Sequence, residues 1–204
     1  MASEGLRVYV GAGQDAPDWT SRGWLCNDLP EAAAIYGSIG LIGPCWVLSV
    51  PDGSVSEIMA RGVLEHLTYH EVTWAFAEWR RALAPGGHVD VEVPDVIEYL
   101  REYERITREG TPCPKEWSDC YPGEPEDHVV CSGADRWLRR AICGWQRYPG
   151  DEHRSAWTEP LFRHYLGKYL SPAFEVRRMA ISFDEDDPGA RVRHLWARAR
   201  REAS

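Results

Sequence analysis

Strand-like and helical segments alternate along the first half of the chain, and this alternation constrains the fold more than any other feature. Apolar segments at 6–10, 23–28, 38–43, 55–61 and 88–93 are predicted strands. Strands that alternate with helices form a mostly parallel sheet whose strands end along one edge. We therefore predict an α/β fold with its ligand site at that edge.

Two helices have clear start and stop signals. Thr68 and Glu71 have the spacing of a capping box, and the apolar positions after them recur at helical period until Pro85-Gly86-Gly87. A second helix is predicted over 96–109, capped by Asp95. The first crossover, residues 14–22, has room for only a very short helix.

The last third of the chain predicts two more helices and a terminal hairpin. Their ranges are 134–143 and 158–170 for the helices, and 174–183 and 191–201 for the strands. Asp90 and Glu92 alternate with valines in a strand that a parallel sheet should bury on both faces. Either these acids pair with arginines of the last strand, or one face of the sheet is thinly covered.

Composition narrows the class of protein. A chain of 204 residues suits one domain, and a net charge of −9 argues against a nucleic-acid partner. Neither an export signal nor a stretch long enough to span a membrane is evident, so we expect a cytoplasmic protein without a membrane partner. Its six cysteines are then expected to be reduced. The oligomeric state is not predicted.

The sequence does not favour a structural zinc site. Cys113, Cys120, His128, Cys131 and Cys143 crowd into one region, but only His128 and Cys131 are close in sequence. Zinc sites usually contain a C-x2-4-C pair. We therefore predict no metal ligands.

The first strand stops on Gly11-Ala12-Gly13, which begins a G-x-G-x-x-A pattern. This pattern fits a dinucleotide site, where a helix N-terminus receives a pyrophosphate. The short crossover, which contains Pro17, favours a cofactor without a phosphate instead. Asp28 ends the second strand and is placed to accept hydrogen bonds from a ribose, although a solvated acid at a strand end is the alternative.

Four further segments occur in a characteristic order. They read LSVPDGSVSEI (48–58), VLEHL (63–67), EWRRALAPGGHVDVEVPD (78–95) and CGWQRYPGDEHR (143–154). Together with the glycine turn they resemble class I S-adenosylmethionine-dependent methyltransferases, in particular a small bacterial type with the pattern LPFPDGSFDEI, HVLEH, LKPGG and VPD. The resemblance covers residues 6–198.

The resemblance implies a Rossmann-like three-layer sandwich, with a seven-stranded, mostly parallel sheet whose last strand is antiparallel. It also implies one methyltransferase domain over 1–204, in which an insertion at about 96–157 forms the acceptor side. The expected cofactor is S-adenosyl-L-methionine, and the expected reaction is methyl transfer to a hydroxyl or amine of a small molecule. The residues expected to bind the cofactor are Gly11, Ala12, Gly13, Asp28, Leu29, Trp46, Val47, Gly62 and Glu65.

Candidate catalytic and acceptor-binding residues lie in the later segments. His66 and His153 are candidate bases for a hydroxyl acceptor, because imidazole exchanges protons near neutral pH. The alternative for His66 is a structural role, in which it caps or packs against the turn before the helix. The alternative for His153 is a solvated side chain in a polar loop. Trp145, Tyr148 and Arg154 are candidates to bind a ring-bearing or acidic acceptor. The long loop at 111–131 is expected to form, together with these residues, the side of the pocket that holds the acceptor.

Two departures from the family pattern support a second hypothesis. Pro44-Cys45 stands where relatives commonly have an acidic residue, and Gly62 stands where many have histidine. A catalytically silent, cofactor-binding partner subunit is therefore the alternative. A nicotinamide-dinucleotide oxidoreductase is a weaker one.

Overall fold

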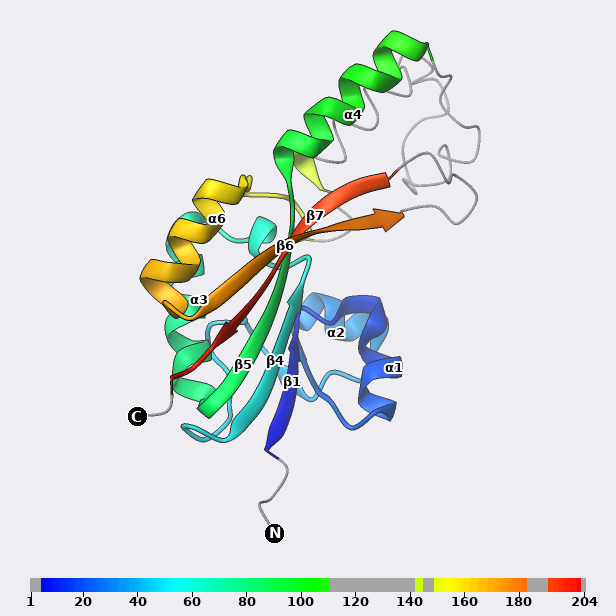
Figure 1. Cartoon of the computed structure of the whole chain (residues 1–204). Coiled ribbons are helices and arrows are strands. Elements are labelled where there is room, and N and C mark those ends of the chain that lie inside the picture. Colours follow the sequence, from blue (N-terminus) through cyan, green and yellow to red (C-terminus); the bar gives the residue numbers. More distant parts are fainter. Residues whose placement is uncertain (1–4, 111–141, 145–148, 183–190, 203–204) are drawn as a thin grey trace.

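The computed structural model describes residues 5–110, 142–144, 149–182 and 191–202 (Figure 1). Its centre is a seven-stranded sheet in the order β3-β2-β1-β4-β5-β7-β6. The strands are β1 (Leu6–Val10), β2 (Leu25–Asp28), β3 (Leu41–Ile42), β4 (Val55–Arg61), β5 (Leu83–Pro94), β6 (Phe174–Ser182) and β7 (Arg191–Arg200).

The direction of the strands confirms the predicted fold class. β1 pairs in parallel with β2 and β4, and the outer pairs β2–β3 and β4–β5 are also parallel. β7 runs antiparallel to both of its neighbours, β5 and β6. The terminal hairpin is therefore present, and the last strand is the one that reverses direction.

Helices lie on both sides of the sheet. η1 (Gly13–Asp15), α1 (Ala16–Ser21) and α2 (Pro30–Tyr36) lie on one side, and α3 (Tyr69–Ala82) and α6 (Glu159–Tyr165) on the other (Figure 1). η2 (Leu64–His66) follows β4, α4 (Val96–Glu109) follows β5, and the π-helical η4 (Leu166–Leu170) follows α6. No described helix is long and apolar enough to cross a membrane.

The two faces of the sheet are covered unequally. The larger core packs valines of β1, β4 and β5 against Phe76, Trp79 and Phe162 of the helices. The smaller core, on the other face, gathers around β1, β2 and α1. Beyond it, Asp90 is held by Arg198, 2.6 Å away on β7. The first alternative therefore holds for Asp90, whereas Glu92 contacts His194 of β7 at 3.0 Å instead of an arginine of that strand.

The boundaries differ from the sequence prediction in three places. β5 already begins at Leu83, because Leu83 pairs with Val55 before the register shifts. The predicted strand at 38–43 is reduced to two residues, and the prediction did not include α2. Of the helix predicted at 134–143, only the last two residues are described, and they are helical.

A charged cluster on α3 joins the segments 48–58 and 78–95, which both belong to the methyltransferase-like sequence pattern. Arg81 donates to the carbonyl oxygens of Leu48 and Val50, at 3.0 Å each, and pairs with Glu78 and Asp52. Glu78 in turn accepts from the backbone N–H of Leu48 at 2.8 Å. The side-chain hydrogen bond from Arg81 lowers the pKa of Glu78. This cluster fixes the segment that leads into the 51–54 turn.

Replacing Arg81 with alanine should lower the free energy of unfolding by about 2 kcal/mol, because two carbonyl groups and two carboxylates lose a charged donor. Urea unfolding followed by circular dichroism would measure the loss. The exposed neighbour Arg80 is the matched control, and Arg80→Ala should change stability little. Equal effects of the two substitutions would contradict this assignment.

Candidate functional site

A cavity of about 670 Å³ lies where β1, β2 and β4 end, which is the edge predicted from the strand pattern. This volume suits a ligand of cofactor size. The residues that line it are Tyr9, Gly11, Ala12, Gly13, Gln14, Asp15, Asn27, Asp28, Leu29, Tyr36, Gly43, Pro44, Cys45, Trp46, Arg61, Gly62, Val63, His66, Leu67, Gly150, Asp151 and Arg154.

The glycine turn after β1 forms the floor of this cavity. Gly11 has φ +63°, and a Cβ there would lie 2.5 Å from Cγ2 of Val63. A side chain at this position would therefore be strained in its backbone and would also collide with the segment after β4. Glycine at position 11 lets the β1 turn pack closely against Val63.

Asp28 closes the other side of the turn. One carboxylate oxygen accepts from the backbone N–H of Gly13 and the other from that of Leu29, both at 2.7 Å. Burial raises the pKa of Asp28, although these two hydrogen bonds oppose that shift. The carboxylate lines the cavity with both oxygens already oriented by backbone donors.

Cys45 and Trp46 form another part of the cavity wall. The indole N–H of Trp79 donates to the carbonyl oxygen of Cys45 at 2.9 Å and so ties this wall to α3. Val47, a predicted cofactor residue, does not line the cavity. Its backbone N–H closes a turn onto Pro44, and 57% of the residue's surface is exposed.

Charged residues of both signs line the cavity. Asp15 and Asp151 add to the negative charge of Asp28, whereas Arg61 and Arg154 provide positive charge. Arg154, a predicted acceptor-binding residue, also pairs with Glu71 at 2.9 Å.

Sequence reasoning missed several lining residues: Tyr9, Asp15, Asn27, Tyr36, Arg61 and Asp151. Arg61 had a usable signal, since it is the last residue of β4 and therefore lies at the carboxyl edge.

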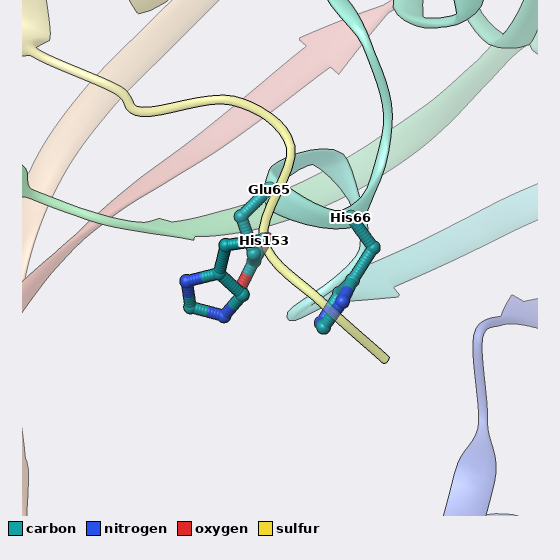
Figure 2. A group of neighbouring side chains, drawn as sticks. All are labelled: Glu65, His66 and His153. Carbon is teal, nitrogen blue, oxygen red and sulfur yellow. The ribbon is translucent and has the colours of Figure 1, made fainter. Parts of the chain in front are cut away.

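The two candidate catalytic histidines lie next to each other. Their ring centroids are 5.0 Å apart, and the rings meet edge to face (Figure 2). His66 lines the large cavity, whereas His153 lines a small neighbouring cavity of about 20 Å³. The structure thus brings together two residues that are 87 positions apart in the sequence.

Glu65 lies with these histidines and not in the large cavity. The backbone N–H groups of Arg154 and Ser155 donate to its carbonyl oxygen, which places η2 beneath the 153–155 segment. The residue is 4% exposed, and burial raises the pKa of its carboxyl group to about 8. Its predicted contact with the cofactor therefore lacks support from this placement.

The remaining predicted residues divide into two groups. Gly11, Ala12, Gly13, Asp28, Leu29, Trp46 and Gly62 all line the large cavity, and their binding of a cofactor stays a prediction. Trp145, Tyr148 and the loop at 111–131 lie outside the described residues. Of the five residues considered as zinc ligands, only Cys143 lies in the described part of the chain, where its carbonyl oxygen accepts from the backbone N–H of His153 at 3.1 Å.

Comparisons with solved structures show the fold of S-adenosylmethionine-dependent methyltransferases. A methyltransferase of this class from Methanosarcina mazei is 15% identical, with a TM-score of 0.58 and coverage of 100% of this chain and 95% of that chain. A possible histamine N-methyltransferase from Thermotoga maritima is 14% identical, with a TM-score of 0.56 and coverage of 99% and 84%.

A third structure of the same fold contains ligands. It is the 1,6-didemethyltoxoflavin-N1-methyltransferase of Burkholderia thailandensis, with bound 1,6-didemethyltoxoflavin and S-adenosylhomocysteine. It is 14% identical to this chain, with a TM-score of 0.51 and coverage of 98% of this chain and 72% of that chain. No protein-family model and no curated protein sequence matches the chain.

Proposed function

We propose that the protein is an enzyme that transfers a methyl group from S-adenosyl-L-methionine to a hydroxyl or amine of a small molecule. The observation that carries this proposal is the large cavity lined by the Gly11–Gly13 turn and Asp28, in a sheet with the methyltransferase strand order. In this proposal Asp28 accepts hydrogen bonds from the ribose, and Trp46 lies along the adenine.

The charges around the glycine turn favour this cofactor over a dinucleotide. Asp15 lines the cavity at the end of η1, two residues after Gly13, and Asp28 lies across the turn. A pyrophosphate there would be repelled by both carboxylates, whereas the sulfonium and ammonium groups of S-adenosylmethionine are attracted. α1 also has only six residues and begins with Ala16 and Pro17, so it offers a weak anion site.

The chemical step requires little from the protein beyond position. The acceptor's oxygen or nitrogen forms a bond to the methyl carbon, the bond from that carbon to sulfur breaks, and the sulfur keeps the electron pair. The acceptor must therefore be held in line with the sulfonium at about 3 Å. A hydroxyl acceptor also releases a proton, and we assign its removal to the wall formed by His66 and His153.

The acceptor is expected to bind beside that wall. Segment 149–155 carries Asp151 and Arg154 into the cavity, and the 96–157 region as a whole follows β5 at the carboxyl edge. Within it, Trp145, Tyr148 and the 111–131 loop remain proposed acceptor contacts. The net charge of −9 favours a small molecule over a nucleic acid.

Asp28→Ala should weaken binding of S-adenosylhomocysteine by about 1.5–3 kcal/mol, because a charged acceptor for the ribose is lost. Titration calorimetry would measure the change. Asp18→Ala is the matched control, because Asp18 is an exposed acid on α1 that pairs only with Arg22 in the described chain. An Asp28→Ala dissociation constant equal to that of the control would show that Asp28 does not hold the ribose.

The proposed function itself is tested with both cofactor classes. S-adenosylhomocysteine should raise the melting temperature, and NAD should not. Labelled S-adenosylmethionine should then pass its methyl group to a component of a small-molecule extract. Binding of NAD alone would indicate an oxidoreductase. Tight S-adenosylhomocysteine binding with no methyl transfer to any extract would favour a silent partner subunit.

A further inference from the structure

Glu65, His66 and His153 converge at the boundary between the two cavities. Each offers one atom that can bind a metal, and these three atoms lie within 4.8 Å of one another. Figure 2 shows the carboxyl end of Glu65 beside the His153 ring, with the His66 ring across from it. Two imidazole nitrogens and one carboxylate oxygen are a common ligand set for a divalent transition-metal ion.

The backbone holds this cluster in place. The N–H groups of Arg154 and Ser155 donate to the carbonyl oxygen of Glu65 at 2.7 and 3.0 Å. The hydroxyl of Ser155 donates to the carbonyl oxygen of Leu64 at 2.9 Å. His153 is therefore fixed against η2, although it comes from a segment far along the chain.

The carboxyl group of Glu65 is buried with one oxygen unpaired, so a bound cation would stabilise its charged form. The residue is 4% exposed, and its Oε2 has no hydrogen-bond partner among the described residues. A buried carboxylate is costly unless a cation, a proton or strong donors compensate its charge. Arg154 is not that cation, because its guanidinium pairs with Glu71.

The environment of His66 also suits a metal ligand. Its Nδ1 lies 3.3 Å from the carbonyl oxygen of Glu152. A neutral ring that donates from Nδ1 keeps its lone pair on Nε2, and metal-binding histidines usually make such a second contact to a carbonyl or carboxylate.

We propose that Glu65, His66 and His153 bind one divalent transition-metal ion at the wall of the cavity. Oxygen-preferring ions such as Mg²⁺ fit poorly, because two of the three ligands are imidazoles. Three protein ligands leave at least one position open for an exchangeable ligand. His66 lines the large cavity, so that position can face a bound acceptor, and an acceptor hydroxyl on the ion would lose its proton more readily.

A second group of similar residues shows why the first is favoured. Glu57, His88 and Asp90 also lie within 4.8 Å of one another. There, however, the guanidinium of Arg198 lies 2.6 Å from Asp90 and already supplies the positive charge. A metal ion would have to displace that arginine, so this group serves as a control.

The test is titration of the untagged full chain with Zn²⁺ and Co²⁺, followed by calorimetry and by the visible absorption of bound Co²⁺. We expect one ion per chain. Glu65→Gln and His153→Ala should each weaken binding by about 100-fold or more, at least as much as loss of an outer-shell partner costs. His88→Ala should leave binding unchanged. Replacing Cys113, Cys120, Cys131 and Cys143 with serine should also leave it unchanged, which would exclude these four thiolates as ligands.

Two outcomes would overturn the site. One is the absence of a bound ion in the unsubstituted chain, and the other is equal binding by the chain and by Glu65→Gln. Circular dichroism must show that each variant is folded. Metal binding can be tested without measuring methyl transfer. Measuring S-adenosylhomocysteine binding on the same variants distinguishes failure of the metal site from failure of the proposed function. Retained cofactor binding without ion binding would overturn the metal site alone.

Discussion

Replacing Trp79 with alanine is expected to lower the free energy of unfolding by about 3–5 kcal/mol. Trp79 is fully buried in α3 and packs against Phe76 with ring centroids 5.4 Å apart. The substitution leaves a cavity in the larger core and also removes the indole donor to the carbonyl oxygen of Cys45. Urea unfolding with a fluorescence or circular dichroism signal would measure the loss.

Two further variants separate packing from hydrogen bonding. Trp79→Phe keeps most of the buried ring but removes the N–H group, so it should cost less than Trp79→Ala and still loosen the Cys45–Trp46 wall. Trp74→Ala removes a ring on the same helix that is 47% exposed and packs only against Trp46 and His70 among the described aromatic rings, so it should cost much less than Trp79→Ala. A loss below 1 kcal/mol for Trp79→Ala would mean that α3 does not pack as described.

Replacing His153 with alanine is expected to lower the rate of methyl transfer by about 100-fold or more at neutral pH, if the acceptor is a hydroxyl. The ring lies beside His66 and Glu65, where the proposed reaction removes the acceptor's proton. Affinity for S-adenosylhomocysteine should be nearly unchanged, because His153 does not line the large cavity. Single-turnover rates with labelled cofactor would measure the loss of methyl transfer, and titration calorimetry would measure the affinity for S-adenosylhomocysteine.

The pH dependence tests the role of His153 beyond its contribution to structure. The ratio of the methyl-transfer rate of the unsubstituted chain to that of His153→Ala should fall as the pH rises towards the pKa of the acceptor, because an ionised acceptor needs no base. His164→Ala, an exposed histidine of α6, should match the unsubstituted chain throughout. If this rate ratio is the same at every pH, His153 does not take part in removing the proton.

The secondary structure of the chain was predictable where local signals agree with the tertiary fold. The capping box of Thr68 and Glu71 begins α3 as predicted, and Asp95 caps α4, which Gly110 ends in the left-handed conformation. The start of β5 was not predictable, because its pairing with β4 overrides the Pro85-Gly86-Gly87 signal. Tertiary pairing here outweighs local propensity.

The candidate site was predictable along the carboxyl edge and less so beyond it. Gly11 and Asp28 follow strands directly, so strand order places them together. The contact between Glu65 and His153 depends on how a distant segment folds back over η2, and the local sequence contains no signal for that path. Burial of Glu65 likewise arises only when this segment covers it.

Glu71 takes part both in the cap of α3 and in the cavity wall. Its side chain closes the capping box with Thr68 and also holds Arg154 of the cavity wall. Burial works to raise the pKa of Glu71, but hydrogen bonds from Thr68 and Arg154 outweigh it and lower that pKa. Because Arg154 helps to hold the Glu71 carboxylate that closes the capping box, we expect displacement of the 153–155 segment to break this ion pair and to weaken the start of α3.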